Sequence, residues 1–357
     1  MELYRYSSEL IKRHQAPSGA FVAAPAFSQY QYCWLRDGTW LAYSMDLAGE
    51  VEAAEKFYRW VDRTIRKQAA KIDTLIEQKR RGERPTPEQF LHTRFTVEGE
   101  AGSEPWGNHQ LDGYGMYLWG FGEHLKRRAG ADILRAEFAP SLRATGAYLL
   151  EFWSEPCFDC WEERGDQVHP STLAAIYGGL RALAELFPDL DLQIEPACRK
   201  MRELVERSGV VEGRFIKSLG DLRIDANLLS LAVPFAMFAP ADLRMVRTVA
   251  AVEAELCTGG VHRYRDDSFY GGGAWPLLTA WLGWYHLQRG DVKRATDLLT
   301  WVEAQADAGG NLPEQVPEGL FVPTEHQRWI ERWGQPAKPL LWSHAMYVVL
   351  KRQFMIN

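Results

Sequence analysis

The sequence predicts an all-α protein with the architecture of an (α/α)6 barrel, in which six helical hairpins close into a toroid. Helical periodicity runs from one end of the chain to the other. The connections between the expected helices alternate between short and long, and every second helix is apolar nearly all round. No repeat of roughly 20–50 residues is visible, so we expect a closed toroid rather than an open solenoid. One domain is expected over residues 1–357.

Apolar residues recur at helical spacing in twelve segments. In the third segment, Phe57, Val61 and Ile65 fall on one stripe and charged residues occupy the rest of the surface. Glycine interrupts the pattern where a C-terminal cap is needed, as at Gly49 and Gly290. The helices are expected at residues 3–14, 37–48, 50–80, 110–127, 131–153, 170–186, 189–208, 224–233, 240–256, 273–288, 291–307 and 340–354.

The connections after the odd-numbered helices are the long ones. Even-numbered helices, such as 110–127 and 273–288, have no polar face, and a helix of this kind is buried on all sides. We therefore expect the even-numbered helices to form an inner ring whose N-termini meet the long loops. Long loops within a compact domain are usually functional. They are expected at residues 15–36, 81–109, 154–169, 209–223, 257–272 and 308–339.

The bulk composition excludes several classes of partner. A net charge of −6 offers no basic surface for nucleic acid or anionic lipid. No run approaches the roughly 18 apolar residues that a membrane span needs. The N-terminus lacks the apolar core of a signal peptide. We predict a cytoplasmic protein that binds neither nucleic acid nor membrane, and its oligomeric state stays open.

The five cysteines do not suggest a disulfide framework, because their number is odd and the chain is long. Cys157 and Cys160 have CxxC spacing, but there is no second pair and no matching histidine cluster. We predict no metal site and no cofactor. Whether these two cysteines pair with each other is open.

The first long loop combines aromatic and charged side chains at Tyr30, Trp34, Arg36 and Asp37. Flat aromatic faces can stack on the C–H faces of sugars. Arginine and aspartate supply the donors and acceptors that pyranose hydroxyls require. The alternative is that Asp37 caps the following helix, with Arg36 as its surface ion pair.

Later loops bring carboxylates beside aromatic residues. The run Trp161-Glu162-Glu163-Arg164 places two adjacent glutamates next to an indole, although a charged surface turn has the same composition. Glu314 follows a proline in the loop that must cross the end of the barrel. Trp106, in the second long loop, either contacts a ligand or closes the barrel.

Five long-loop regions, taken in order, resemble those of glycoside hydrolase family 15, the glucoamylase family. They are YQYCWLRDG, EPWGNHQLDGYG, CWEERGD, GGVHRYRDDSFYGGGAW, and NLPEQV with PLLWSHA, and the resemblance extends over residues 30–345. It implies an inverting, exo-acting α-glucosidase that releases β-glucose from the non-reducing end of short α-glucosides. The substrates implied are of the isomaltose type (α-1,6) or malto-oligosaccharides (α-1,4).

The resemblance also implies a role for each site residue. Glu162 corresponds to the general acid and Glu314 to the general base. Arg36 and Asp37 correspond to the pair that holds the non-reducing glucose by its far hydroxyls. The remaining implied substrate contacts are Tyr30, Trp34, Trp106, Trp161, Glu163, Arg164, Arg263 and Trp342.

Two segments depart from the family's pattern near the expected position of the leaving sugar. They are residues 169–171, which follow the two glutamates, and residues 325–334. Linkage and chain-length preference therefore stay open, and residues 325–334 belong either to the substrate site or to a subunit interface. An inverting enzyme must leave room for a water, so we expect a carboxyl separation of roughly 6.5–9.5 Å between the two catalytic glutamates. Negative charge from Glu163 and apolar walls from Trp161 are expected to favour the protonated form of the acid.

Three other functions are compatible with the same barrel. The first is a non-catalytic glucan-binding or regulatory module, since a fold does not determine a function. The second is a trehalose hydrolase. The third is a sugar epimerase or isomerase, which would usually need a pair of histidines at the end of the barrel. His262 and His344 are the candidates for such a pair, and a core role is expected for His344.

Overall fold

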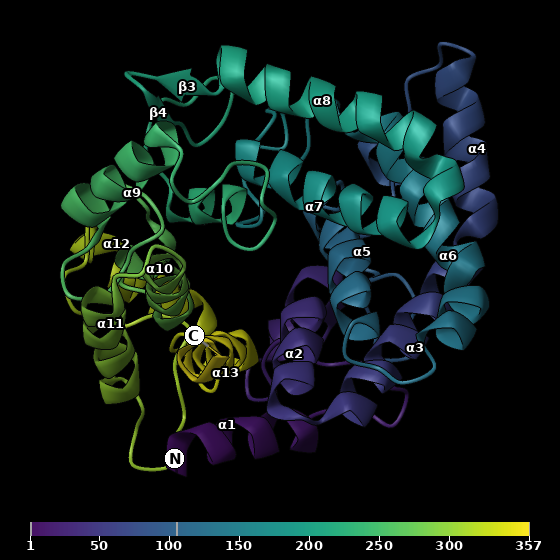
Figure 1. Cartoon of the computed structure of the whole chain (residues 1–357). Helices are drawn as coiled ribbons and strands as arrows, with labels where there is room; N and C mark the ends of the chain where they lie inside the picture. The colour runs from purple at the N-terminus through teal and green to yellow at the C-terminus, as the bar shows by residue number, and fades with distance from the viewer. Residues whose placement is uncertain (1, 105, 357) are drawn as a thin grey trace.

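Two concentric rings of helices surround a common axis in the computed structural model, which describes residues 2–104 and 106–356 (Figure 1). Each inner element packs against the next, and the last packs against the first, so the ring is closed. The predicted (α/α)6 barrel is therefore confirmed. The inner ring consists of α2 (Leu35–Ala48), α5 (Asp112–Leu125), α7 (Pro170–Leu186), the 3-10 helix η4 (Ala226–Leu231), α10 (Pro276–Gln288) and α13 (Leu341–Ile356).

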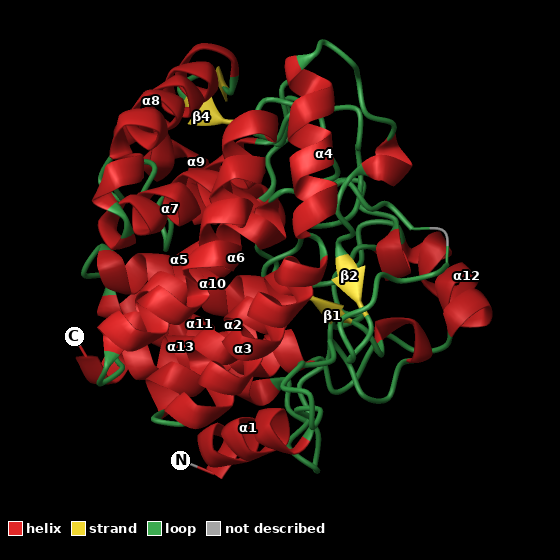
Figure 2. Cartoon of the chain, turned by 90° about the vertical axis from the view of Figure 1, so that its right-hand side faces the viewer, coloured by secondary structure: helices red, strands yellow, loops and turns green. Residues whose placement is uncertain are grey.

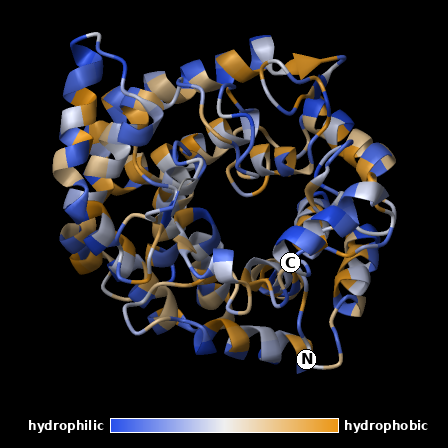
Figure 3. Ribbon diagram, turned by 180° about the vertical axis from the view of Figure 1, so that it is seen from behind, coloured by the Kyte–Doolittle hydropathy of each residue, from blue (hydrophilic) through white to orange (hydrophobic). Residues whose placement is uncertain are grey.

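The outer ring contains the helices with a polar face. In α2 of the inner ring every residue except Ala48 is buried, whereas α3 of the outer ring buries one stripe and leaves charged residues in solvent. In Figure 3 hydrophilic and hydrophobic residues alternate along these outer helices. The outer ring consists of α1 (Glu2–Arg13), α3 (Val51–Lys67), α4 (Ala69–Arg80), α6 (Ala131–Phe152), α8 (Asp191–Ser208), α9 (Leu243–Leu256) and α11 (Val292–Ala304).

Two predicted helices differ from the structure. The segment 50–80 is broken at Gln68 into α3 and α4, because α4 leaves the line of α3 to pack against α6. The segment 224–233 forms only the short 3-10 helix η4. Asp225 caps its first turn by accepting from the backbone N–H of Asn227. Pro234 lacks an N–H and restricts the residue before it, so the helix cannot continue.

Close approach of α5 and α7 depends on glycine. A Cβ added at Gly115 would lie 2.5 Å from the carbonyl oxygen of Ala175, and one added at Gly179 would clash with the backbone of Gly115. These two positions therefore allow the backbones of the two inner helices to meet, which offsets the low helix propensity of glycine.

The long connections gather at one end of the barrel, where the inner helices begin (Figure 2). Here β1 (Cys33–Trp34) pairs antiparallel with β2 (Arg94–Phe95). A second antiparallel pair, β3 (Val210–Val211) with β4 (Arg214–Phe215), directly follows α8. Single 3-10 turns lie in three of the long connections: η1 (Ser28–Tyr30), η2 (Pro87–Gln89) and η5 (Phe269–Gly271). A further turn, η3 (Pro188–Leu190), lies in the short connection between α7 and α8.

The last long connection contains a helix that helical periodicity did not predict. This helix, α12 (Pro323–Trp333), has no buried residue and packs against η5 rather than into either ring. It begins at a proline, a residue favoured in the first helical turn. Among the described residues, no helix is long and apolar enough to span a lipid bilayer.

Candidate active site

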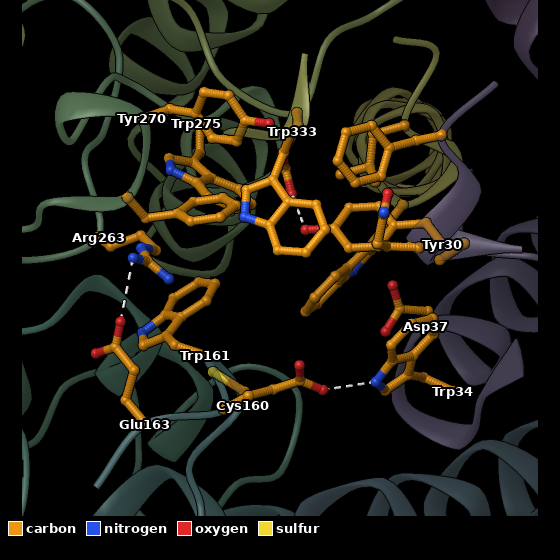
Figure 4. A pocket seen from close by; sticks show the side chains of 18 of the residues that line it. Tyr30, Trp34, Asp37, Cys160, Trp161, Glu163, Arg263, Tyr270, Trp275 and Trp333 are labelled. Carbon is orange, nitrogen blue, oxygen red and sulfur yellow. Dashed lines mark hydrogen bonds and ion pairs between the residues drawn. The ribbon is translucent and has the colours of Figure 1, made fainter. Parts of the chain in front are cut away.

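A pocket of about 400 Å³ opens at the loop end of the barrel (Figure 4). Its volume falls within the usual range for small-molecule sites, and its lining residues include eleven aromatic and seven charged side chains. Eleven of the twelve predicted site residues line it: Tyr30, Trp34, Arg36, Asp37, Trp106, Trp161, Glu162, Glu163, Arg263, Glu314 and Trp342.

Arg164 is the predicted site residue that does not line the pocket. Its side chain is exposed, and its carbonyl oxygen is bonded by the ring of His169 at 3.1 Å. Glu162 and Arg164 both have positive φ, 66° and 51°, so the chain reverses sharply here. This reversal carries the arginine away from the pocket that Glu162 and Glu163 face.

Glu162 lies in a turn that its own neighbours stabilise. Its positive φ is unusual for a residue with a Cβ. Asp159 holds the turn, because its Oδ1 accepts the backbone N–H groups of Trp161 and Glu163, each at 3.0 Å. The carbonyl oxygen of Asp159 accepts the N–H of Glu162 at 2.9 Å. The local strain is thus held by a closed set of hydrogen bonds, as is common at functional sites.

Among the residues that the structure describes, three side chains approach the carboxylate of Glu162 as donors, and all three reach the same oxygen. Trp34 Nε1 donates to Oε1 at 2.6 Å, Gln110 Nε2 donates to the same atom at 3.1 Å, and Arg36 Nη2 lies 3.5 Å from it. Among the described residues, no donor reaches the other oxygen, Oε2. Gln110 was not among the predicted site residues, although it lies in the same sequence segment as Trp106.

Glu314 is buried, with 3% of its surface exposed. Tyr30 donates its hydroxyl to Oε1 at 2.9 Å, and Oε2 has no hydrogen-bond partner among the described residues. Burial raises the pKa of Glu314 to about 7, while the hydrogen bond from Tyr30 and the charge of Arg263 act in the opposite direction. A buried carboxyl with one free oxygen and a pKa near neutrality fits the requirements of a general base.

Arg36 and Asp37 are buried rather than on the surface. Trp34 occupies the N-cap position of α2 and Asp37 lies in the first turn, so the alternative of a capping Asp37 with a surface ion pair is wrong. Arg36 lies 3.7 Å from Asp37, 3.8 Å from Asp112 and 5.6 Å above the ring of Trp342. Burial raises the pKa of Asp37 to about 6, although Arg36 opposes the shift. This donor–acceptor pair at the base of the pocket suits the hydroxyls of one sugar ring.

Glu163 faces away from Glu162, contrary to the prediction that it would supply a neighbouring negative charge. Its Oε1 lies 3.3 Å from Arg263, and its Oε2 accepts the hydroxyl of Tyr264 at 2.6 Å. Arg263 stacks on Trp161 at 5.1 Å, so arginine, indole and carboxylate form one wall of the pocket (Figure 4).

Several pocket residues were not predicted. Trp275 lies beside Trp161, with 5.6 Å between ring centroids. Tyr270 has a φ of 47° and packs against Trp329 of α12, with 5.8 Å between ring centroids. The triple glycine before Trp275 could have indicated that this residue lies near a ligand. Trp329 lies on α12, a helix that the sequence did not predict. The other lining residues outside the prediction are Ala23, Phe27, Gln29, Cys160, Ser268, Phe269, Arg332, Trp333 and Leu340.

The two histidines considered for a different chemistry do not line the pocket. His344 is buried, with Nδ1 bonded to Ser7 at 2.8 Å and Nε2 accepting the backbone N–H of Leu312 at 2.9 Å. His262 is bonded to Thr258 and to the carbonyl oxygen of Gly272, at 2.6 and 2.8 Å. Both rings therefore stabilise the fold and do not form the histidine pair that an epimerase needs.

The cysteines and candidate metal ligands were also located. Cys157 and Cys160 are free thiols, and Cys160 lines the pocket. Across residues 2–104 and 106–356, no group of three or more histidine, cysteine or acidic side chains is arranged to hold a metal ion.

Comparison with known proteins agrees with this geometry. The family model for glycosyl hydrolases family 15 matches residues 2–313. An isomaltose glucohydrolase from Kribbella flavida is 44% identical over 98% of this chain and 91% of its own length. A solved wild-type glycosidase superimposes with a TM-score of 0.94, 43% identity and coverage of 99% of this chain and 96% of its own. A variant glycosidase with the same figures was solved in complex with glucose.

A more distant structure supports the fold alone. A bacterial glucoamylase complexed with acarbose covers 99% of this chain and 55% of its own, with a TM-score of 0.79 and 19% identity. The family match ends one residue before Glu314, so the role of this glutamate rests on its position in the pocket. The extent of the family match and the relative at 44% identity lead to one conclusion: the chain belongs to glycosyl hydrolase family 15 and is a glycoside hydrolase.

Proposed function

We propose that this protein is an inverting, exo-acting α-glucosidase that releases β-glucose from the non-reducing end of short α-glucosides, with isomaltose as the preferred disaccharide. The observation that carries the proposal is the presence of two glutamates, Glu162 and Glu314, in the wall of one sugar-sized pocket. Each has one oxygen held by protein donors. The identity of 44% to an isomaltose glucohydrolase supports the choice of linkage.

In the proposed reaction, Arg36 and Asp37 hold the terminal glucose at the base of the pocket. Glu162 gives its proton to the glycosidic oxygen as the bond from this oxygen to the anomeric carbon breaks. Glu314 takes a proton from a water that attacks the anomeric carbon from the opposite face. The products are β-glucose and the shortened sugar, and proton exchange with solvent restores both carboxyl groups.

The preference for short substrates is supported by α12. Trp329, Arg332 and Trp333 of this helix line the pocket together with the aromatic residues of η5. Their side chains narrow the space beyond the terminal glucose. A disaccharide fits a pocket of about 400 Å³ better than a long α-glucan does.

A substrate panel tests this proposal. The purified chain is incubated with isomaltose, maltose and trehalose, and released glucose is measured, with Glu162→Gln and Glu314→Gln as controls. We expect the highest kcat/KM on isomaltose and a loss of about 10²–10⁴-fold in each variant, the usual contribution of a general acid or base. Preference for trehalose would instead indicate a trehalose hydrolase, and no glucose from any disaccharide would indicate a non-catalytic module.

A further inference from the structure

A buried lysine lies directly behind the turn that carries Glu162. Lys217 follows β4 in the fourth long connection and has only 1% of its surface exposed. Its Nζ lies 2.6 Å from Asp225, 3.2 Å from Asp159 and 3.9 Å from Glu163. It does not line the pocket, so it cannot contact the substrate directly. A lysine is almost never buried to this degree unless it is paired with groups of opposite charge.

The first partner, Asp159, is the residue that folds the turn. Its Oδ1 accepts the backbone N–H groups on either side of Glu162, while its Oδ2 faces Lys217 at 3.2 Å. The ammonium therefore fixes the plane of this carboxylate. Because Glu162 has positive φ, the turn would relax to a more favourable backbone conformation if Asp159 rotated.

The second partner, Asp225, connects the turn to the inner ring. Its carboxylate accepts hydrogen bonds from Trp161 Nε1 at 3.0 Å and from the backbone N–H of Asn227 at 2.9 Å. The hydrogen bond from Asn227 caps η4. Lys217 thus joins the loop of the general acid to a helix of the barrel through one charged group.

The charges around Lys217 make its ammonium necessary. Three carboxylates, Asp159, Asp225 and Glu163, face its Nζ, and Glu163 is also shared with Arg263. The ring of Tyr264 covers the remaining side, 3.8 Å from Nζ. Without the ammonium, Asp159 and Asp225 would repel each other in surroundings of low dielectric constant, and the turn would shift.

We propose that Lys217 is a positioning residue for the general acid, which holds the Asp159 turn and thereby aims Glu162 at the glycosidic oxygen. This inference rests on the assignment of Glu162 as the acid in the proposed function. It predicts a defect specific to protonation of the leaving group. Binding of the terminal glucose and activation of water use Arg36, Asp37 and Glu314, which do not contact Lys217.

Two substrates separate this defect from general damage. Isomaltose has a poor leaving group that needs a proton from the acid, whereas α-D-glucosyl fluoride releases fluoride, a good leaving group that needs far less assistance. The quantity to measure is the ratio of kcat/KM on isomaltose to kcat/KM on the fluoride. Because both substrates are assayed on one preparation, any fraction of unfolded protein cancels in the ratio.

In Lys217→Met we expect the ratio of kcat/KM on isomaltose to kcat/KM on the fluoride to fall at least about tenfold. A general acid contributes roughly 10²–10⁴-fold, and misplacing it should lose part of that contribution. Lys217→Arg keeps the charge and should show a smaller fall. Lys79→Met is the control, because Lys79 is likewise a paired lysine, with Glu155 at 2.6 Å and a side chain 25% exposed, but lies on α4 outside the pocket. Its ratio should not change.

Glu162→Gln, measured in parallel, separates the two levels of the inference. An unchanged ratio in Glu162→Gln would overturn the assignment of the acid itself. A large fall in Glu162→Gln together with an unchanged ratio in Lys217→Met would overturn only the role of Lys217. If Lys217→Met yields no soluble enzyme, Asp159→Asn tests the same contact from the side of the turn. An unchanged ratio in that variant counts equally against the proposal.

Discussion

Tyr30 and Trp34 lie edge to face, with 5.9 Å between their ring centroids and 82° between their planes. Each holds one of the two glutamates: the hydroxyl of Tyr30 donates to Glu314 at 2.9 Å, and Nε1 of Trp34 donates to Glu162 at 2.6 Å. The proposed acid and base are distant in sequence, yet a single short loop orients both. The packing of these two rings therefore sets the relative position of the two donors.

Trp34→Phe should reduce kcat/KM on isomaltose by about 10- to 150-fold. The variant keeps an aromatic ring but removes the hydrogen bond that Trp34 donates to Glu162. This bond stabilises the carboxylate that forms as Glu162 gives up its proton, and a hydrogen bond to a charged group is worth about 1.5–3 kcal/mol. Steady-state kinetics measure the change. Tyr32→Phe is the control in the same loop, because the hydroxyl of Tyr32 bonds Glu104 and its ring does not line the pocket. Equal losses in the two variants would contradict a specific role for Trp34.

The acidic limb of the kcat/KM profile should lie near pH 7. Glu314 has a pKa raised to about 7 and must be ionised to accept a proton from water. Activity should therefore decrease about tenfold for each pH unit below this value. Tyr30→Phe removes a hydrogen bond that lowers the pKa of Glu314, so the limb should move to higher pH. A limb that stays in place in Tyr30→Phe would show that another group controls it.

Glu314→Gln should make the protein more stable at pH 8 but not at pH 4. The pKa of Glu314 is about 7 in the folded state and 4.5 by its ordinary value, so the folded protein binds the extra proton between these values. The wild type therefore loses stability as pH rises from 4.5 through 7, by about 3 kcal/mol for a shift of this size. Urea unfolding of both proteins at the two pH values measures the difference. An equal free energy of unfolding at pH 8 would contradict the raised pKa.

Trp333→Ala should weaken activity on isomaltose without changing stability. Trp333 is 38% exposed at the end of α12 and lines the pocket, so its removal deletes a sugar-facing surface but little of the core. An aromatic contact of this kind is worth about 0.5–1.5 kcal/mol, which corresponds to about a 2- to 12-fold loss in kcat/KM. Thermal unfolding provides the check on stability. Unchanged kinetics would remove this side chain from the substrate site.

Much of the fold was predictable because the inner helices differ chemically from the outer ones. A helix such as α7 is buried on nearly all sides, so its sequence has no polar face and indicates an inner helix directly. The predicted bounds of α7 agree with the structure. Where packing rather than local sequence decides, prediction failed. Gln68 has no breaking residue beside it, and the chain turns there because α4 packs against α6.

Site residues that belong to short loop motifs could be predicted from the sequence. Site residues that are brought together by contacts between distant segments could not. Trp34 and Glu162 lie in short segments with unusual composition. Lys217 gave no such signal, since a lysine in a loop is usually exposed, and only the fold brings three carboxylates around it. The orientation of Arg164 also depends on positive φ in its turn, which the sequence does not reveal for a residue other than glycine.

In the proposed mechanism, two glutamates on opposite faces of one sugar act as acid and base, with a water between the sugar and the base. Proton NMR of the first glucose released from isomaltose distinguishes this mechanism from the alternatives, because the anomeric resonances are resolved before mutarotation mixes them. With Glu314 as the base, we expect the β-anomer to appear first and the α-anomer to grow only afterwards. Initial release of α-glucose would mean that Glu314 attacks the sugar itself or takes no part, and inversion would be ruled out.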